Sequence, residues 1–292
     1  MDTAGPMART VTDAAMLMGV LEGNAPDPSD RAMPACSMPR DHDYTPHLKR
    51  DGLKGARIGI PRAFYYDKVT PPGETAPRGG LTDDQAKAMA EAIDVLKREG
   101  AVIVDPADLP SVVDSDPANN HVLWGVCSGV PGAKATDAKC SIVFKYGMKR
   151  DFNAWLRTLG PGAPVKTLTE LRNFNLAGPE RGAIKYGQSQ LDISDEIDLE
   201  ADRARYQTDR ARDIALAATR GIDAAMKTHR LDALLFPAAT GALIAARPGY
   251  PTVIVPYGMI RNAPTPPFPD GSPPVRRPSA SASRGWRAAS RA

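Results

Sequence analysis

A strand–helix–strand unit in residues 56–105 constrains the fold more than any other feature of the sequence. Residues 56–61 alternate as a strand does and end at a proline. Thr82, with Gln85 three residues later, forms a capping box before a helix, and a short apolar strand follows at 101–105. Because such a crossover joins parallel strands, the unit predicts a right-handed connection covering a parallel pair. We expect one face of the helix to carry Ala86, Met89, Ala90, Ile93 and Leu96.

Two later apolar runs continue this pattern. Residues 231–237 and 252–256 are short, rich in apolar residues and ended by proline, so each predicts a buried strand. Residues 5–22 predict a helix with Thr10 or Thr12 as its N-cap. The apolar face of that helix would hold Ala14, Leu17, Met18 and Leu21. Strands alternating with helices indicate an α/β domain in layers.

A long, charged helix is predicted over residues 192–229. Pairs of opposite charge three residues apart, Asp202 with Arg205 and Asp209 with Arg212, are expected on an exposed face. The inward face would then carry Ile197, Ala201, Ala204, Ala211, Ala215, Ala218 and Ile222.

The last 32 residues differ from the rest of the chain. Residues 261–292 hold six arginines, one acid and a cluster of prolines, which predicts a disordered tail after a domain at 1–260. Without them the chain has 31 basic and 33 acidic residues, a net charge of −2. The basic character therefore belongs to the tail, and we expect no nucleic-acid partner.

The motif search favours a protein without cofactor, metal or membrane partner. Cys36, Cys127 and Cys140 are odd in number and form no C-x-x-C pair, so neither a disulfide framework nor a zinc site is expected. The four histidines are scattered, and no phosphate-binding loop of the P-loop or Rossmann type occurs. No signal peptide precedes the domain and no apolar run reaches the ~18 residues of a membrane span. These observations predict a soluble, cytoplasmic chain.

Two stretches contain nucleophiles in suggestive places. Residues 125–129 resemble a nucleophile elbow, but Ser128 stands one position late, so Cys127 and Ser128 are interpreted as loop or packing residues. Ser141 and Lys145 could meet on a helix as a Ser–Lys dyad. The alternative, a capping or exposed serine beside a solvated lysine, is the more common arrangement.

Several segments, in order along the chain, resemble the amidase signature family. The most specific is residues 2–13, which follow that family's pattern D-T-x-G-P-x-A-R-T-V-x-D. Further similar stretches are 53–62, 149–156, 159–166, 231–237 and 249–256.

The resemblance implies a partial amidase-type mixed sheet flanked by helices, and hydrolysis of a small-molecule carboxamide by a Ser–cis-Ser–Lys triad. In that family the triad lies before the D-T-x-G-P segment, so it would precede Met1 and no catalytic residue is assigned here. The chain is then an incomplete amidase domain over 1–260, expected to be inactive alone. The alternative is a pseudoenzyme, or a partner-dependent module completed in trans by a triad-bearing chain. The loop 238–246 offers Ala239 and Thr240 as a possible pocket wall, or is a plain connection.

Overall fold

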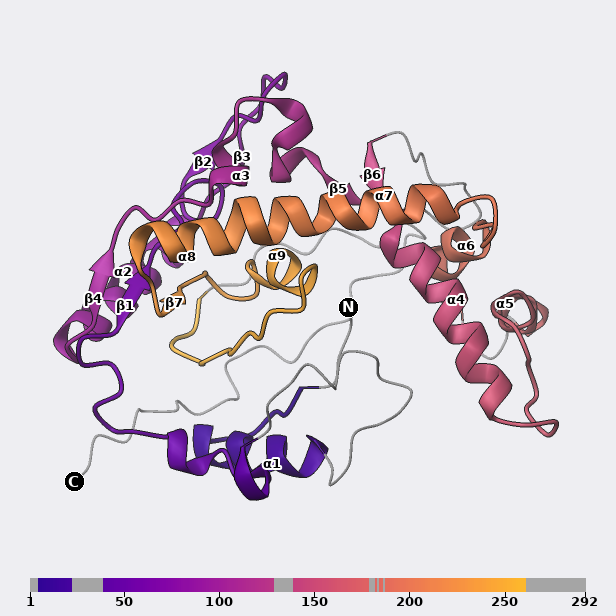
Figure 1. The fold of residues 1–292 in the computed structure, drawn as a ribbon, viewed down its shortest axis with the longest axis horizontal. Coiled ribbons are helices and arrows are strands. Elements are labelled where there is room, and N and C mark those ends of the chain that lie inside the picture. Colours follow the sequence, from indigo (N-terminus) through magenta and orange to yellow (C-terminus); the bar gives the residue numbers. More distant parts are fainter. Residues whose placement is uncertain are drawn as a thin grey trace.

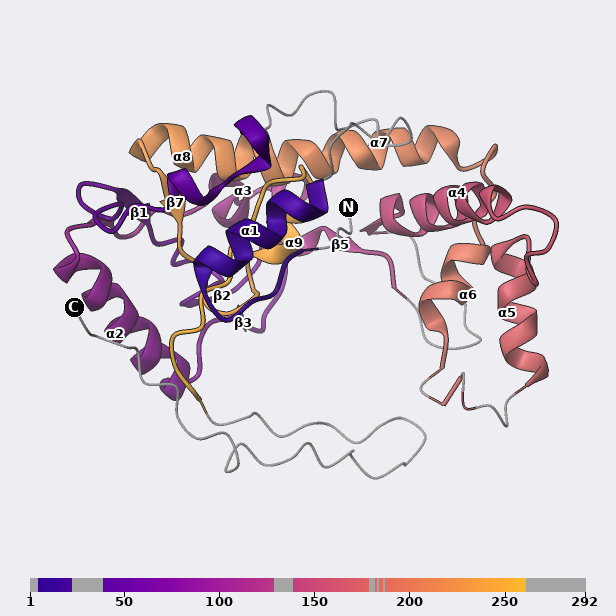
Figure 2. The ribbon, with the colours of Figure 1, turned by 90° about the horizontal axis from the view of Figure 1, so that it is seen from below.

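The computed structural model describes residues 5–22, 39–128, 139–178, 182, 184–185 and 187–260. One long helical rod runs across the molecule (Figure 1). It consists of α7 (Arg203–Ile214), the π-helical segment η7 (Ala215–Ile222) and α8 (Asp223–His229). The main sheet lies at one end of the rod, and helices α4, α5 and α6 lie at the other (Figures 1 and 2).

The main sheet is parallel, as the strand–helix–strand unit predicts. Its order is β4 (Val102–Val104), β1 (Arg57–Gly59), β7 (Ala233–Leu234). Ile58 pairs with Ile103 on one side and with Ala233 on the other. The mixed α/β class is thereby confirmed.

Helix α2 (Asp83–Arg98) connects β1 to β4 and begins at the predicted capping box. The Thr82 hydroxyl accepts a hydrogen bond from the Gln85 N–H, and the Gln85 side chain accepts one from the Thr82 N–H. Of the predicted apolar face, Ile93 is buried and Met89 and Leu96 are half-buried, but Ala86 and Ala90 are exposed. The buried face is therefore rotated from the predicted one, toward Ala92 and Val95, both half-buried.

The core lies between the sheet, α2 and the rod. Tyr65 and Tyr66 follow β1 into it, and Tyr66 donates its hydroxyl proton to the Leu235 carbonyl. Ring-edge contact between Tyr65 and Phe236, with centroids 4.7 Å apart, joins the segments after β1 and β7. The buried members of this cluster are Ile60, Tyr65, Tyr66, Ile93, Leu109, Val112, Val122, Ala217, Ala225 and Ile244.

The remaining elements are short or lie at the far end of the rod. The described residues include an antiparallel pair, β2 (Lys68–Val69) with β3 (Arg78–Gly79), and a parallel pair, β5 (Gly125–Val126) with β6 (Cys140–Ser141). The helices of the far end are α4 (Val143–Thr158), α5 (Leu168–Ala177) and α6 (Ser189–Asp195). The shorter helical elements are α3 (Pro110–Val113), α9 (Ala242–Ala246), and the 3-10 turns Arg40–His42, Thr45–His47, Pro117–Asn119 and His121–Leu123.

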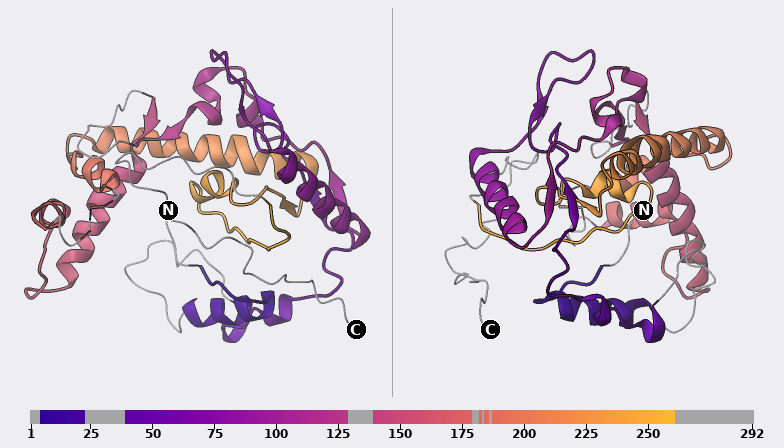
Figure 3. Two further views of the ribbon diagram at one scale, coloured as in Figure 1. Left: turned by 180° about the vertical axis from the view of Figure 1, so that it is seen from behind. Right: turned by 60° about the vertical axis from the view of Figure 1, so that its left-hand side comes forward.

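Helix α1 (Val11–Glu22) begins six residues later than predicted. The Thr10 hydroxyl accepts a hydrogen bond from the Asp13 N–H, which confirms Thr10 as a cap. None of its residues is buried, and of its predicted apolar face Ala14 is half-buried while Leu17, Met18 and Leu21 are exposed. The helix and the rod lie on opposite sides of the segment that follows residue 246 (Figure 3).

Three further predictions need correction. The long helix begins at Arg203, because residues 189–195 form the separate α6 and turns join the two. Its charged face is not the exposed one: Asp209 is buried, whereas Ala201, Ala204 and Ala211 are exposed. Residues 252–256 form no strand and are exposed, because no described strand lies beside them. The predicted tail, 261–292, lies outside the described residues.

Candidate functional site

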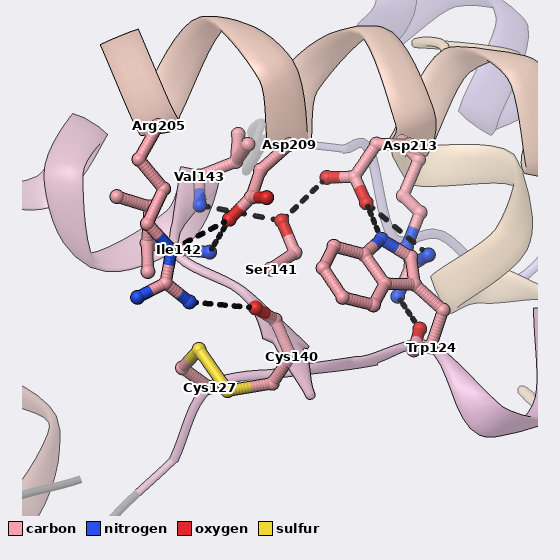
Figure 4. The surroundings of a disulfide bond; sticks show 10 residues. Trp124, Cys127, Cys140, Ser141, Ile142, Val143, Arg205, Asp209 and Asp213 are labelled. Atoms are coloured by element: carbon pink, nitrogen blue, oxygen red, sulfur yellow. Dashed lines mark hydrogen bonds and ion pairs between the residues drawn. A yellow bond between two sulfur atoms is a disulfide. The ribbon is translucent and has the colours of Figure 1, made fainter. Parts of the chain in front are cut away.

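The polar groups that the structure brings together lie where β5 and β6 meet the rod (Figure 4). Cys127 and Cys140 are joined there by a disulfide, with their Cα atoms 4.9 Å apart. The prediction that the cysteines form no disulfide is therefore wrong for this pair. The pairing of β5 with β6 places the two thiols together, although the residues are 13 apart in sequence. Cys127 is consequently no nucleophile in this oxidised state, and Ser128 beside it is exposed.

Ser141 is buried beside the disulfide and is held by two hydrogen bonds. Its hydroxyl donates to the Asp213 carboxylate at 2.8 Å and accepts from the Val143 N–H at 3.3 Å, at the start of α4. Lys145 is also buried, with 1% of its surface exposed, so the predicted solvated lysine is wrong. The proton of Ser141 is directed to Asp213 and not to Lys145. The geometry therefore gives Ser141 a structural role at the helix start.

Asp213 is the centre of the cluster. Its carboxylate accepts hydrogen bonds from Trp124 Nε1 and Ser141 Oγ, both at 2.8 Å, and lies 3.3 Å from Arg247 Nη1. Asp209, one turn earlier, accepts from the Ile142 N–H at 3.0 Å and lies 3.5 Å from Arg205. These two carboxylates hold β6 and the start of α4 against the rod.

Arg247, which directly follows α9, is the buried basic residue of the cluster and contacts both Asp213 and Trp124. It is 2% exposed, and its Nη2 donates to the Trp124 carbonyl at 2.6 Å. Burial lowers the pKa of Arg247, and the Asp213 charge opposes that shift. The Arg212 guanidinium lies 3.9 Å from the centroid of the Trp124 ring, a cation–π contact.

His121 is the buried histidine nearest this cluster in sequence. Burial, assisted by the positive charge of Arg247, lowers its pKa to about 3. Within the described part of the chain its Nδ1 has no hydrogen-bond partner. The imidazole is thus neutral at ordinary pH, with no described carboxylate to orient it as a catalytic base.

The sequence missed Asp209, Asp213, Arg247 and Trp124. The first two stand four residues apart and so share one helix face, which could have indicated an inward carboxylate pair. The prediction from the sequence instead paired Asp209 with Arg212 on an exposed face, and the spacing of the two carboxylates was not used. Arg247 lies in an alanine-rich segment, where no local pattern predicts burial.

The predicted pocket wall lies apart from this cluster. Ala239 and Thr240 are exposed residues of the turn between β7 and α9, where the Thr240 hydroxyl donates to the Pro237 carbonyl at 2.7 Å. A shallow, mostly apolar cavity of about 550 Å³ lies elsewhere, on the rod. Its lining is Tyr206, Gln207, Arg210, Ala211, Ile214, Ala215 and Thr219.

Histidine, cysteine and carboxylate side chains of the described residues form no group of three that could hold a metal ion. No described helix is long and apolar enough to cross a membrane. The contacts of Asp213 and Asp209 position β6 and the start of α4 against the rod.

Known proteins resemble this chain over most of its length. Residues 1–268 match the Amidase family model. An amidase-named protein of Arthroderma benhamiae is 26% identical over 264 residues, which are 89% of this chain and 39% of that protein. One subunit of the glutamyl-tRNA(Gln) amidotransferase of Carboxydothermus hydrogenoformans is 35% identical over 72% of this chain and 39% of its own length.

Solved structures give the same result. The native peptide amidase of Stenotrophomonas maltophilia superposes with a TM-score of 0.63 at 29% identity, over 88% of this chain and 47% of the enzyme. This chain thus spans less than half the length of each of these relatives. With the family model matched over nearly all of its residues, the chain belongs to the amidase family.

Proposed function

We propose that this chain contributes one part of an amidase that hydrolyses the C–N bond of a small-molecule carboxamide to a carboxylate and ammonia or an amine. We further propose that the 292 residues alone are inactive. The observation that carries this proposal is the combination of a family match over residues 1–268 with coverage of only 47% of the peptide amidase.

The chemistry of the described residues supports the second statement. A serine attacks an amide only when a nearby base takes its proton and N–H groups stabilise the oxyanion. Ser141, the buried serine nearest a lysine in sequence, donates a hydrogen bond to the Asp213 carboxylate, which also accepts one from Trp124 and lies 3.3 Å from Arg247. The activated serine is therefore proposed to come from the part of the amidase domain that this chain does not cover.

An ammonia-release assay tests this proposal. The purified 292-residue chain is incubated with acetamide, benzamide and an amidated dipeptide, with the Stenotrophomonas peptide amidase as a positive control. We expect the chain to release ammonia at the rate of buffer alone. A rate above buffer that follows the protein through purification refutes its inactivity.

The proposal also includes residues that contact the substrate and the cellular location of the chain. Ala239 and Thr240, exposed beside α9, are proposed to form part of the pocket wall once the domain is complete. A cytoplasmic location is proposed as well, and the Cys127–Cys140 pair provides its test because disulfides are rare in reducing compartments. When cells are quenched in acid and the chain is denatured with an alkylating reagent, alkylation of both cysteines is expected, whereas their protection until a reductant is added would argue against this location.

A second candidate is a partner-dependent module completed in trans. Its support is a large amount of exposed apolar surface, including Met16, Val20, Val253, Ile254 and Val255. Such surface marks interaction sites in stable proteins. The amidotransferase relative is named as one subunit of an enzyme, which favours the same interpretation. Activity that appears only after mixing with a triad-bearing chain would distinguish this module from a pseudoenzyme.

A further inference from the structure

We propose that Cys127 and Cys140 form a redox switch, which holds β5 against β6 when the pair is oxidised and releases β5 when the pair is reduced. Cys127 directly follows β5 and Cys140 begins β6, so the disulfide joins the two strands of this short pair (Figure 4). Regulation of this kind is independent of the proposed activity, because no step of it requires an amide substrate.

Strand β6 is attached to the rod by contacts that involve no sulfur atom. The Ser141 hydroxyl donates to Asp213 at 2.8 Å, and the Ile142 N–H, directly after the strand, donates to Asp209 at 3.0 Å. Both carboxylates belong to α7. Strand β6 is therefore expected to stay on the rod in both redox states.

Strand β5 has weaker attachments of its own. In the described part of the chain it pairs with β6 alone, over two residues, and the Cys127 N–H adds a hydrogen bond to the Ser141 carbonyl at 3.0 Å. An isolated two-stranded pair is at best marginally stable in water. Gly125 is exposed and Val126 half-buried, so little apolar burial supplements these hydrogen bonds. The covalent bond through Cys127 is therefore the main attachment of β5.

Trp124, immediately before β5, limits how much of the chain the switch releases. Its indole Nε1 donates to Asp213 at 2.8 Å, and its carbonyl accepts from Arg247 at 2.6 Å. These bonds do not include the disulfide either. Reduction thus frees β5 and Cys127, while Trp124 on one side and Ser141 on the other stay attached to the rod.

Release of β5 uncovers an apolar cluster. Cys127 is 1% exposed and packs with Ile142, Tyr146 and Ile197, which are also buried. When Cys127 moves away, these side chains lose a neighbour and become accessible to solvent. The two redox states therefore differ in the apolar surface that the chain presents.

The reaction is thiol–disulfide exchange with a dithiol protein of the thioredoxin class. Cys140 is half-buried whereas Cys127 is buried, so a thiolate of the reductant attacks the Cys140 sulfur. The S–S bond breaks, and Cys127 leaves as a thiolate that takes up a proton. The second thiol of the reductant then displaces Cys140, which is also protonated, and the reductant becomes a disulfide. Two electrons and two protons have passed to the pair.

Amide hydrogen exchange of the full 292-residue chain, measured by nuclear magnetic resonance, tests the switch. The oxidised chain is compared with the chain reduced by thioredoxin, thioredoxin reductase and NADPH. We expect the Cys127 amide to exchange at least tenfold faster in the reduced chain, and the Ile142 amide to change less than twofold. Reoxidation by glutathione disulfide, which yields two molecules of glutathione, should restore the slow exchange.

Two serine variants make the test specific. Cys127→Ser cannot form the bond, so its amide at position 127 should exchange fast with or without reductant. Cys36→Ser is the matched control, since it removes the third cysteine, which lies outside the described residues, and should keep the redox dependence. The wild-type comparison stands by itself if Cys127→Ser does not fold.

Three results overturn the proposal. Equal exchange of the Cys127 amide in the two redox states would show that β5 does not need the bond. Faster exchange of the Ile142 amide and of the rod together with that of Cys127 would make the disulfide a general structural support. A pair that thioredoxin leaves oxidised in the folded chain, measured by alkylation after acid quenching, would show that the bond is no switch.

Discussion

At the scale of single residues, Asp213 determines how the rod, β6 and the Trp124 turn hold together. Its charge is opposite that of the buried Arg247, and breaking a buried pair by removing one partner costs ~3–5 kcal/mol. We therefore expect Asp213→Asn to lower the free energy of unfolding by about 3 kcal/mol, measured by urea denaturation. Asp94→Asn, at an exposed carboxylate paired with Lys97, is the matched control, with an expected loss below ~0.5 kcal/mol. Equal effects of the two changes would contradict the assigned role.

The disulfide gives a second prediction at this scale. It closes a loop between residues 13 apart, and a loop of that size contributes ~3 kcal/mol in the chain-entropy account. Dithiothreitol should lower the unfolding midpoint of the wild-type chain and leave that of Cys127→Ser unchanged. A wild-type midpoint that is insensitive to reductant would show that the bond is absent from the folded protein.

His121 should make stability depend on pH. Its pKa is lowered from 6.5 to about 3 in the folded chain by burial and then by Arg247, so between these values the unfolded state binds a proton that the folded state does not. Its contribution is complete above pH 6.5 and is lost as the pH falls toward 3. His121→Gln should flatten the decrease of the free energy of unfolding between pH 7 and pH 5, and His47→Gln, at an exposed site, should not. An unchanged slope in His121→Gln would contradict this account.

At the scale of elements, the capping box of α2 can be tested alone. Loss of an N-cap hydroxyl typically costs ~1 kcal/mol. Thr82→Ala should lower the free energy of unfolding by about that amount in urea denaturation, because the Gln85 N–H loses its acceptor. Thr82→Ser keeps the hydroxyl and should retain most of the stability. A similar loss in both variants would mean that packing of the threonine methyl, and not the cap, is responsible.

The elements that the sequence predicted correctly are those with local causes. The capping box, the Thr10 cap and the strands around α2 depend on residues a few positions apart, and the structure confirms them. The buried face of the rod was wrongly assigned because its buried carboxylates are bonded by groups far away in sequence: Ser141, Ile142 and Trp124. No pattern within the helix identifies such partners. The run 252–256 has strand composition, but a strand also needs a neighbour, which composition does not supply.

At the scale of the whole molecule, the chain spans less than half the length of the relatives described above. The rod joins a three-stranded sheet at one end to the α4, α5 and α6 helices at the other (Figure 1). Large apolar side chains of α1 and of residues 253–255 are exposed. The chain covers 47% of the peptide amidase that it resembles. The amidase family was identifiable from ordered motifs in the sequence, whereas the Asp213 cluster required the structure.

Ammonia release by the 292-residue chain, purified alone and assayed with simple carboxamides, tests the central claim most directly. We predict a rate equal to that of buffer, because Ser141 is buried and held by hydrogen bonds to Asp213 and to the Val143 N–H. Release above the buffer rate, proportional to protein concentration and abolished by heat, would contradict it.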